Sequence, residues 1–231
     1  MATRNAQRLL RLVNQLLDFQ KLGAGQKKID LNPVNVIRFT QICADYFLSA
    51  CDNKSIKFKV SVDAQPLTEE MSNSERVFIE GEVDALEKII FNLLSNAIKF
   101  TPPEGTIELG VSLQDKTAKL FVRDTGPGIS KEDQSRLFQT FAQLDSTATR
   151  DYEGTGIGLA YVKGLTTAMN GKVGLESEPG QGSCFWVEFN RCEDPGVIDT
   201  ASFKVKDWLL AGLPAKQDES LTSSTNDHTA V

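Results

Sequence analysis

Apolar residues recur at helical spacing in several stretches of the chain and at strand spacing between them. Leu9, Leu12, Leu16 and Phe19 are three and four positions apart, which places them on one face of a helix. In residues 56–62, apolar and polar residues alternate, as in a half-buried strand. The same reasoning predicts helices at 3–22, 34–51, 83–100, 131–138 and about 156–169, and strands at 28–33, 56–62, 77–81, 106–113, 117–124, 171–178 and 183–189.

The order of these elements predicts four regions. Residues 1–24 are expected to form one helix, and residues 25–33 a linker with the first strand. Residues 34–190 hold most of the predicted elements and are expected to form the main domain. After them the apolar pattern fails, and residues 191–231 end in a segment rich in Ser, Thr and Asp. This tail is therefore expected to be largely disordered.

The first helix has an unusually broad apolar face, because Leu10, Val13 and Leu17 widen the stripe. A broad face suits a helix bundle better than a narrow two-stranded seam. The alternative is that this helix packs on its own domain. In the first case, residues 3–22 could hold two copies of the chain together as a homodimer.

Composition narrows the classes of function. The 231 residues, 40% hydrophobic and 24% charged, are typical of a globular protein with one core. The net charge of −6 argues against nucleic acid or a membrane surface as a partner, and no apolar run reaches the roughly 20 residues that span a bilayer. The four cysteines have no CxxC spacing and the one histidine, His228, lies in the polar tail, so they predict no metal site. Lacking a signal peptide, the chain is expected in the cytoplasm with reduced thiols.

The predicted helix at 83–100 carries polar side chains that could form part of a binding site. Asn92, Asn96 and Lys99 follow at i, i+4 and i+7 and so share one face, opposite an apolar one. The amide oxygen of Asn96 is a suitable ligand for Mg²⁺, and the Lys99 ammonium can sit near phosphate. The alternative is an ordinary solvated helix face.

Two glycine motifs follow this helix. In the first, Asp124 ends a strand, where its carboxylate could accept a hydrogen bond from the amino group of adenine, whereas guanine presents a carbonyl there. Gly126 and Gly128 would let the backbone approach a flat base; the alternative is a plain turn. In the second, Gly154, Gly156 and Gly158 precede and open a helix whose N–H groups could hold phosphate, unless they are only a flexible hinge.

The spacing of these glycines fits neither a Rossmann motif nor a Walker P-loop. The polar, irregular residues 142–155 between the two motifs predict a mobile lid.

Taken together, residues 84–188 resemble the catalytic ATP-binding domain of sensor histidine kinases, within the GHKL ATPase superfamily. Five segments fit in the family's order: an asparagine box at 92–100, a first glycine box at 124–129, an aromatic box at 137–141, a second glycine box at 154–159 and a closing segment at 180–185. The resemblance implies an α/β (α+β) fold of the Bergerat type. This fold is a two-layer sandwich of a mixed sheet and helices, here preceded by one bundle-type helix.

The resemblance also implies that the chain binds ATP and Mg²⁺. Asn96 would hold Mg²⁺, Asn92 and Lys99 would reach the phosphates, and Asp124 would read the adenine amino group. The full set of implied cofactor-binding residues is Asn92, Asn96, Lys99, Asp124, Gly126, Gly128, Ile129, Phe141, Gly154, Thr155, Gly156, Ile157, Gly158, Leu159 and Ser183.

One position separates branches of this superfamily. Members that hydrolyse ATP carry a glutamate four residues before the metal-binding asparagine, where it activates water. Here that position is Asn92, and an amide is no general base at neutral pH. The chain is therefore expected to transfer the phosphoryl group rather than hydrolyse ATP.

The helix at 3–22 resembles the second helix of the kinase dimerisation and phosphoacceptor hairpin. The first helix, with the acceptor histidine, is not in this sequence, and His228 is not expected to serve in its place. The resemblance implies a two-component kinase that transfers the γ-phosphoryl of Mg-ATP to a histidine elsewhere, in trans or in a longer chain. A response regulator receiver domain would then be a partner. The alternative is a non-catalytic ATP-binding module that acts through ATP-dependent protein contacts.

Overall fold

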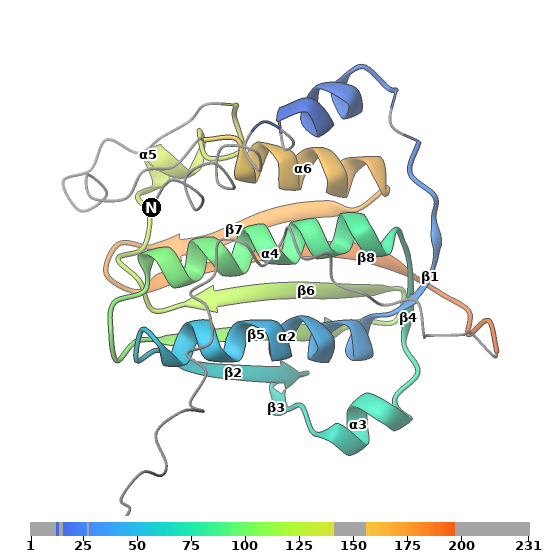
Figure 1. The fold of residues 1–231 in the computed structure, drawn as a ribbon, viewed down its shortest axis with the longest axis horizontal. Helices are drawn as coiled ribbons and strands as arrows, with labels where there is room; N and C mark the ends of the chain where they lie inside the picture. Colours follow the sequence, from blue (N-terminus) through green and yellow to red (C-terminus); the bar gives the residue numbers. More distant parts are fainter. Residues whose placement is uncertain (1–12, 14–15, 27, 141–155, 197–231) are drawn as a thin grey trace, which may run out of the picture.

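The computed structural model describes residues 13, 16–26, 28–140 and 156–196. Its strands form one eight-stranded sheet, and the three longest helices lie side by side on one face of it (Figure 1). The strands are β1 (Asn32–Asn35), β2 (Lys57–Val62), β3 (Gln65–Pro66), β4 (Phe78–Gly81), β5 (Thr106–Leu113), β6 (Thr117–Asp124), β7 (Lys172–Glu178) and β8 (Gly182–Cys192). The helices are α2 (Val36–Asp52), α3 (Glu69–Ser74), α4 (Val83–Phe100), α5 (Lys131–Gln134) and α6 (Gly158–Ala168), and residues 16–23 are also helical.

The helix α4 forms where the apolar spacing predicts it. Its inward positions Leu86, Ile90 and Leu93 are almost fully buried against the sheet and the neighbouring helices. The helix ends at Phe100, because the next residues include Pro102 and Pro103, which cannot continue a helix. The hydroxyl of Thr101 donates to the Ala97 carbonyl oxygen at 2.7 Å and closes the last turn.

The order of strands in the sheet places the ends of distant segments side by side. The order is β1-β4-β8-β6-β5-β2-β3, with β7 also paired to β8. Because β6 and β8 are antiparallel, Asp124 at the end of β6 lies opposite Ser183 at the start of β8. This register brings the first glycine motif next to the closing segment at 180–185.

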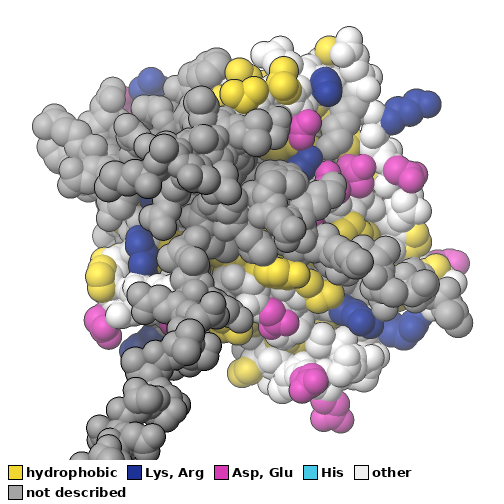
Figure 2. Space-filling model, viewed as in Figure 1, with side chains coloured by type: hydrophobic (Ala, Val, Ile, Leu, Met, Phe, Trp, Pro, Cys, Tyr) yellow, Lys and Arg dark blue, Asp and Glu magenta, His cyan; other side chains and the backbone are white. Residues whose placement is uncertain are grey.

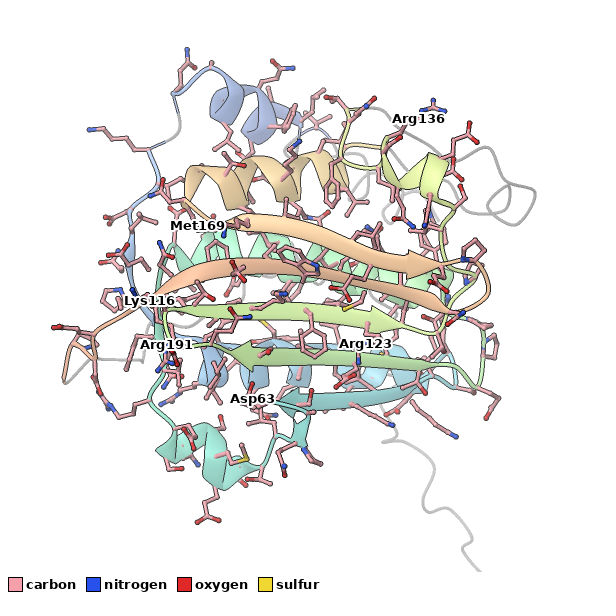
Figure 3. All side chains as sticks on the ribbon, turned by 180° about the vertical axis from the view of Figure 1, so that it is seen from behind. Asp63, Lys116, Arg123, Arg136, Met169 and Arg191 are labelled. Carbon is pink, nitrogen blue, oxygen red and sulfur yellow. The ribbon has the colours of Figure 1, made fainter. Side chains whose placement is uncertain are left out.

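One core lies between the sheet and its helical layer. Residues of α2, α4 and α6 pack on the inward side chains of β5, β6 and β8, and Figure 3 shows the sheet from the other side, where the described chain places no helix. On that side the rings of Phe121 and Trp186 lie over Gly110 and Gly174, where a side chain would collide with them. The expected two-layer α/β sandwich is confirmed.

The first strand lies later than the expected 28–33. It runs from Asn32 to Asn35 and so holds Pro33 inside the strand. Proline is tolerated because β1 is an edge strand, paired only to β4, so its missing N–H group interrupts no second ladder.

The segment 63–75, for which no element was predicted, holds two short ones. It contains the short strand β3 and the helix α3, whose first turn holds Glu69 and Glu70. The hydroxyl of Thr68 accepts a hydrogen bond from the Met71 amide at 3.2 Å and caps this helix. The capping residue Thr68 is the signal in the sequence that could have predicted this helix.

Strand structure continues beyond the expected end of the domain at residue 190. Strand β8 runs to Cys192, because Arg191 and Cys192 pair with Ile79 and Phe78 of β4. Beyond the strand, the Asp194 carboxylate pairs with the Arg76 guanidinium. These long-range pairings do not depend on an apolar pattern, so the sequence pattern could not reveal them.

The N-terminal helical residues 16–23 lie against α6 (Figure 1). Phe19 and Leu22 are half-buried, and the Leu22 side chain reaches Gly164 of α6. Val13 and Leu17, by contrast, are 45% and 51% exposed. The helix therefore packs on its own domain with one side and leaves another apolar side exposed.

In the part of the chain that the structure describes, each helix is too short or too polar to cross a bilayer. On the helix-covered face shown in Figure 2, described Lys and Arg side chains are interspersed with Asp and Glu. The described residues of this face thus offer no continuous basic surface.

Candidate functional site

The polar face of α4 carries the three residues that the sequence singled out. Asn92, Asn96 and Lys99 are each half-buried, between the fully buried inward face and solvent. The Asn92 amide donates to the Lys88 carbonyl oxygen at 2.7 Å, and the Lys99 ammonium lies 4.6 Å from the centre of the Phe100 ring. The helix therefore presents two amides and one ammonium along a single line.

Both glycine motifs touch this helix, at different points along it. A methyl group added at Gly158 would lie 2.9 Å from the Asn92 side-chain oxygen. One added at Gly126 would lie 3.0 Å from the Phe100 carbonyl oxygen and 2.7 Å from Asp124 Oδ1. Only glycine allows such close approaches. The helix α4 therefore contacts both the first glycine motif and the start of α6.

Asp124 is buried at the end of β6, with a relative exposure of 6%. Its Oδ1 accepts a hydrogen bond from the Gly126 amide at 2.8 Å. Burial raises the pKa of this carboxyl, while hydrogen bonds from the backbone amides of Gly126 and Ser183 oppose that rise. The result is a fixed carboxylate in a largely apolar surrounding.

The loop after Asp124 is held against the turn between β7 and β8. The Gly180 amide donates to the Pro127 carbonyl oxygen at 2.7 Å, and the Ile129 amide donates to Ser177 Oγ at 2.9 Å. Ser177 Oγ also lies 3.0 Å from Ser183 Oγ. These bonds fix the loop, so that its position relative to Asp124 is set before any ligand arrives.

Gly128 is the tightest point of this loop. Its φ is +69°, a left-handed conformation, and an added methyl group would overlap the Glu178 carbonyl oxygen. We expect Gly128→Ala to lower the free energy of unfolding by roughly 1–2 kcal/mol for the backbone conformation. The overlap should add about 1–3 kcal/mol. Urea unfolding of the two proteins measures the sum.

The matched control is Gly180→Ala in the neighbouring turn. Gly180 also has a positive φ, +79°, but open space surrounds the position of an added methyl group. Gly180→Ala should therefore lower the free energy of unfolding only by the cost of the left-handed backbone conformation. Equal losses of stability in the two variants would contradict the close approach at Gly128.

The second glycine motif lies at the start of α6. Gly156 has a φ of +67°, Ile157 is buried, and Gly158 and Leu159 are half-buried. Among the described residues, no side chain caps this helix start. Its first N–H groups therefore suit an anionic ligand better than those of α2, which the Asn35 side chain caps.

Some predicted site residues fall outside the part of the chain that is described. These are Phe141, Gly154 and Thr155, together with the expected lid at 142–155 and His228. From the aromatic box, Phe138 lies on the Phe185 ring, with ring centres 6.5 Å apart. The remaining candidates, from Asn92 to Ser183, lie along α4, the loop at 124–129, the start of α6 and the start of β8.

Sequence reasoning missed two groups that support the site. The Gln134 side-chain amide donates to the carbonyl oxygens of Ile129 and Ser177, at 2.8 and 2.9 Å, and so braces the first glycine loop. Lys88, one turn before Asn92, pairs with the carboxylates of Asp84 and Asp18. The spacing of Asp84 and Lys88, four residues apart on one helix, was the signal available for the second group.

The polar side chains of the site can be compared with the groups that bind ATP and Mg²⁺, the two implied cofactors. Among the described residues, no group of three or more His, Cys, Asp or Glu side chains could hold a metal ion by itself. An amide oxygen such as that of Asn96 suits Mg²⁺, which keeps several waters and takes other ligands from phosphates. The buried carboxylate, the glycine loop and the ammonium suit a purine nucleotide with a phosphate chain.

Comparisons with known proteins point to one type of domain. Residues 81–192 match the family described as histidine kinase-, DNA gyrase B- and HSP90-like ATPases. Sensor protein GacS of Pseudomonas syringae pv. syringae is 35% identical over 189 residues, which cover 80% of this chain and 20% of GacS. The circadian input-output histidine kinase CikA of Synechococcus elongatus is 37% identical over 79% of this chain and 23% of CikA. The chain thus spans about a fifth of the length of these relatives.

A solved structure resembles the chain in fold and sequence. Full-length ShkA in complex with AMPPNP is 31% identical, with a TM-score of 0.69, over 84% of this chain and 38% of ShkA. The family match at 81–192 takes in α4, α6, the strands from β5 to β8 and both glycine motifs, whereas α2 and the strands from β1 to β3 precede it.

Proposed function

Because residues 81–192 form an ATP-binding catalytic domain of the histidine kinase type, within the family of histidine kinase-, DNA gyrase B- and HSP90-like ATPases, we propose that this chain transfers the γ-phosphoryl group of Mg-ATP to a histidine on another helix. The observation that carries the proposal is the arrangement around α4. The helix α4 runs between the two glycine motifs. At the first motif it contacts the loop next to the buried carboxylate of Asp124, and at the second the Asn92 side chain lies beside Gly158 at the start of α6.

The base would bind at the first glycine motif. Asp124 is held in place by the Gly126 amide, and its carboxylate can accept a hydrogen bond from the exocyclic amino group of adenine. Guanine presents a carbonyl oxygen at the corresponding place, which a carboxylate would repel. Gly126 and Gly128 let this loop pack closely on Phe100 and Glu178, and Ile129 and Ser183 would lie at the edge of the bound ring.

The phosphates would lie toward the start of α6. Asn96 would hold Mg²⁺ through its amide oxygen, and Asn92 and Lys99 would contact phosphate oxygens. Gly156, Ile157, Gly158 and Leu159 would present backbone N–H groups, continuing from Gly154 and Thr155. Bound Mg²⁺ would neutralise charge that develops on the transferred group.

Transfer is favoured over hydrolysis by the residue at position 92. A hydrolase needs a base that activates water beside the metal-binding asparagine. Asn92 is an amide whose nitrogen donates to the Lys88 carbonyl oxygen at 2.7 Å, so it offers no basic group there.

The proposed acceptor is a histidine-bearing helix, paired with the N-terminal helix of this chain in trans or in a longer protein. The exposed Val13 and Leu17 offer the apolar surface for such a pairing and for a homodimer. A response regulator receiver domain would take the phosphoryl group next. Support comes from the relatives, which carry the names of sensor kinases, although this chain spans only about a fifth of their length.

A transfer assay tests this proposal. The chain is mixed with Mg²⁺, ATP labelled on the γ-phosphate, and an acceptor hairpin of a related kinase. We expect acid-labile, base-stable label on the hairpin histidine, and none on the chain alone, because the Ser/Thr/Asp-rich sequence around His228 does not resemble the helix that holds an acceptor in line with the phosphate. ATP binding without transfer would instead favour a non-catalytic ATP-dependent binding module, and label on His228 would contradict the proposed acceptor.

A further inference from the structure

A charged cluster links the N-terminal helix to the two helices that border the phosphate end of the site. The Lys88 ammonium on α4 lies 2.9 Å from Asp18 Oδ2 and 3.0 Å from Asp84 Oδ2. The Tyr161 hydroxyl on α6 donates to the same Asp18 oxygen at 3.2 Å. Asp18 therefore joins three helices through one carboxylate.

The lysine and the tyrosine of the cluster are buried, whereas the side chain of Asp18 is 33% exposed. The Lys88 side chain is 9% exposed and Tyr161 is 1% exposed. Burial alone would lower the pKa of Lys88, but its hydrogen bonds to Asp18 and Asp84 outweigh burial and raise it, so the lysine stays charged. Burying an ammonium group costs free energy unless carboxylates compensate its charge. Moving Asp18 away would therefore leave the Lys88 ammonium only partly compensated and would destabilise the folded state.

Apolar contacts continue the cluster along the N-terminal helix. Phe19 and Leu22 follow Asp18 on the chain and pack on the core, with the Leu22 side chain against Gly164 of α6. A methyl group at Gly164 would lie 2.8 Å from that side chain. The helix thus sits against α6 through one buried polar contact and a small apolar one.

The cluster is one helical turn from the proposed phosphate contacts on both helices. Lys88 precedes Asn92 by four residues, and the Asn92 amide donates to the Lys88 carbonyl oxygen. Tyr161 follows Gly158 by three residues, and Gly158 approaches the Asn92 side chain. Anything that fixes Lys88 and Tyr161 also fixes the spacing of Asn92 and Gly158.

We propose that Asp18, Lys88 and Tyr161 form a latch that holds the N-terminal helix on α4 and α6, and that closing this latch pre-organises the phosphate end of the nucleotide site. The second half rests on the proposed function. A pre-organised site binds its ligand more tightly, because less ordering is left to occur on binding. By thermodynamic reciprocity, bound Mg-ATP must then favour the docked helix by the same factor.

The primary test variant is Asp18→Asn, measured by amide hydrogen exchange on the full chain. Asp18 lies on the N-terminal helix, and its replacement leaves Lys88 paired with Asp84, so the domain core should stay folded. Without nucleotide, we expect exchange in residues 16–23 to be about tenfold faster than in the unaltered chain, since a charge-assisted contact that closes the helix is lost. Tyr161→Phe, which removes only one hydroxyl, should give a smaller increase in the same residues.

The matched control is Lys172→Gln, which removes the exposed lysine of an ion pair with Glu188 on the sheet. It should leave exchange in residues 16–23 unchanged. If Asp18→Asn also leaves their exchange unchanged while α4 and β6 stay protected, the latch does not exist.

Mg-ATP provides the second arm of the test. We expect it to slow exchange in residues 16–23 of the unaltered chain, and Asp18→Asn to bind Mg-ATP more weakly, by up to the same factor. Calorimetric binding of ATP with no slowing in residues 16–23 would overturn the coupling. If the unaltered chain binds no ATP at all, the proposed function fails, and the nucleotide-free comparison of Asp18→Asn with Lys172→Gln still decides the latch.

Discussion

Asn96→Ala is expected to abolish measurable transfer from Mg-ATP to an acceptor histidine. In the proposed site, Asn96 supplies the protein's ligand to Mg²⁺, and stabilisation of transferring phosphate by a metal amounts to several kcal/mol, or a rate loss of about a hundredfold or more. Single-turnover label transfer to an acceptor hairpin measures this loss. The apolar face of α4 is unaffected by the change, because Asn96 lies on the half-buried polar side.

A neighbouring residue on the same helix provides the control. Ser95 is exposed, directly before Asn96, and Ser95→Ala changes neither the proposed ligand nor the core. It should retain near-normal transfer and the same urea midpoint. If Asn96→Ala transfers phosphate at a rate close to that of Ser95→Ala, Asn96 is not the metal ligand.

Asp124→Asn should have two opposite effects. ATP should bind about tenfold or more weakly, because the amide nitrogen would face the adenine amino group and leave a buried donor unpaired, at roughly 1–3 kcal/mol. Without nucleotide, the variant should unfold at a higher urea concentration at pH 7. The reason is that burial of the ionised carboxylate disfavours the folded state, and the raised pKa of Asp124 reports that cost.

The sign of the pH dependence follows from that direction. Between the ordinary aspartate pKa and the raised pKa of folded Asp124, the folded state keeps a proton that the unfolded state has lost. The contribution of Asp124 to stability is therefore fully present below the ordinary pKa and is lost as the pH rises through the folded pKa. The stability gain of Asp124→Asn should vanish in acid. A gain that is independent of pH would mean that the charge of Asp124 is not its cause.

Local patterns in the sequence predicted much of the fold, because several elements have strong periodicity and clear stop signals. The helix α4 and the strands β5 and β6 occur at the predicted residues, bounded by the prolines after Phe100 and by the turn at 114–116. The family resemblance predicted the two-layer arrangement, which the structure and the related ShkA fold confirm.

Other features depend on contacts between distant segments, which a single sequence does not reveal. The register that places Asp124 opposite Ser183 and the continuation of β8 to pair with β4 are set by the assembled sheet. The close approach of Gly128 to Glu178 needs the coordinates of both turns. Asp18 could not be connected to Lys88 and Tyr161 from the sequence, because the three residues lie on separate helices.

The most direct test of the nucleotide site is a calorimetric titration of the unaltered chain with Mg-ATP and, separately, with Mg-GTP. We expect a single ATP site and GTP binding weaker by about tenfold or more, since the Asp124 carboxylate, held by the Gly126 amide, would accept from the adenine amino group but would face the guanine carbonyl. Equal affinity for the two nucleotides, or no binding of ATP, would contradict it.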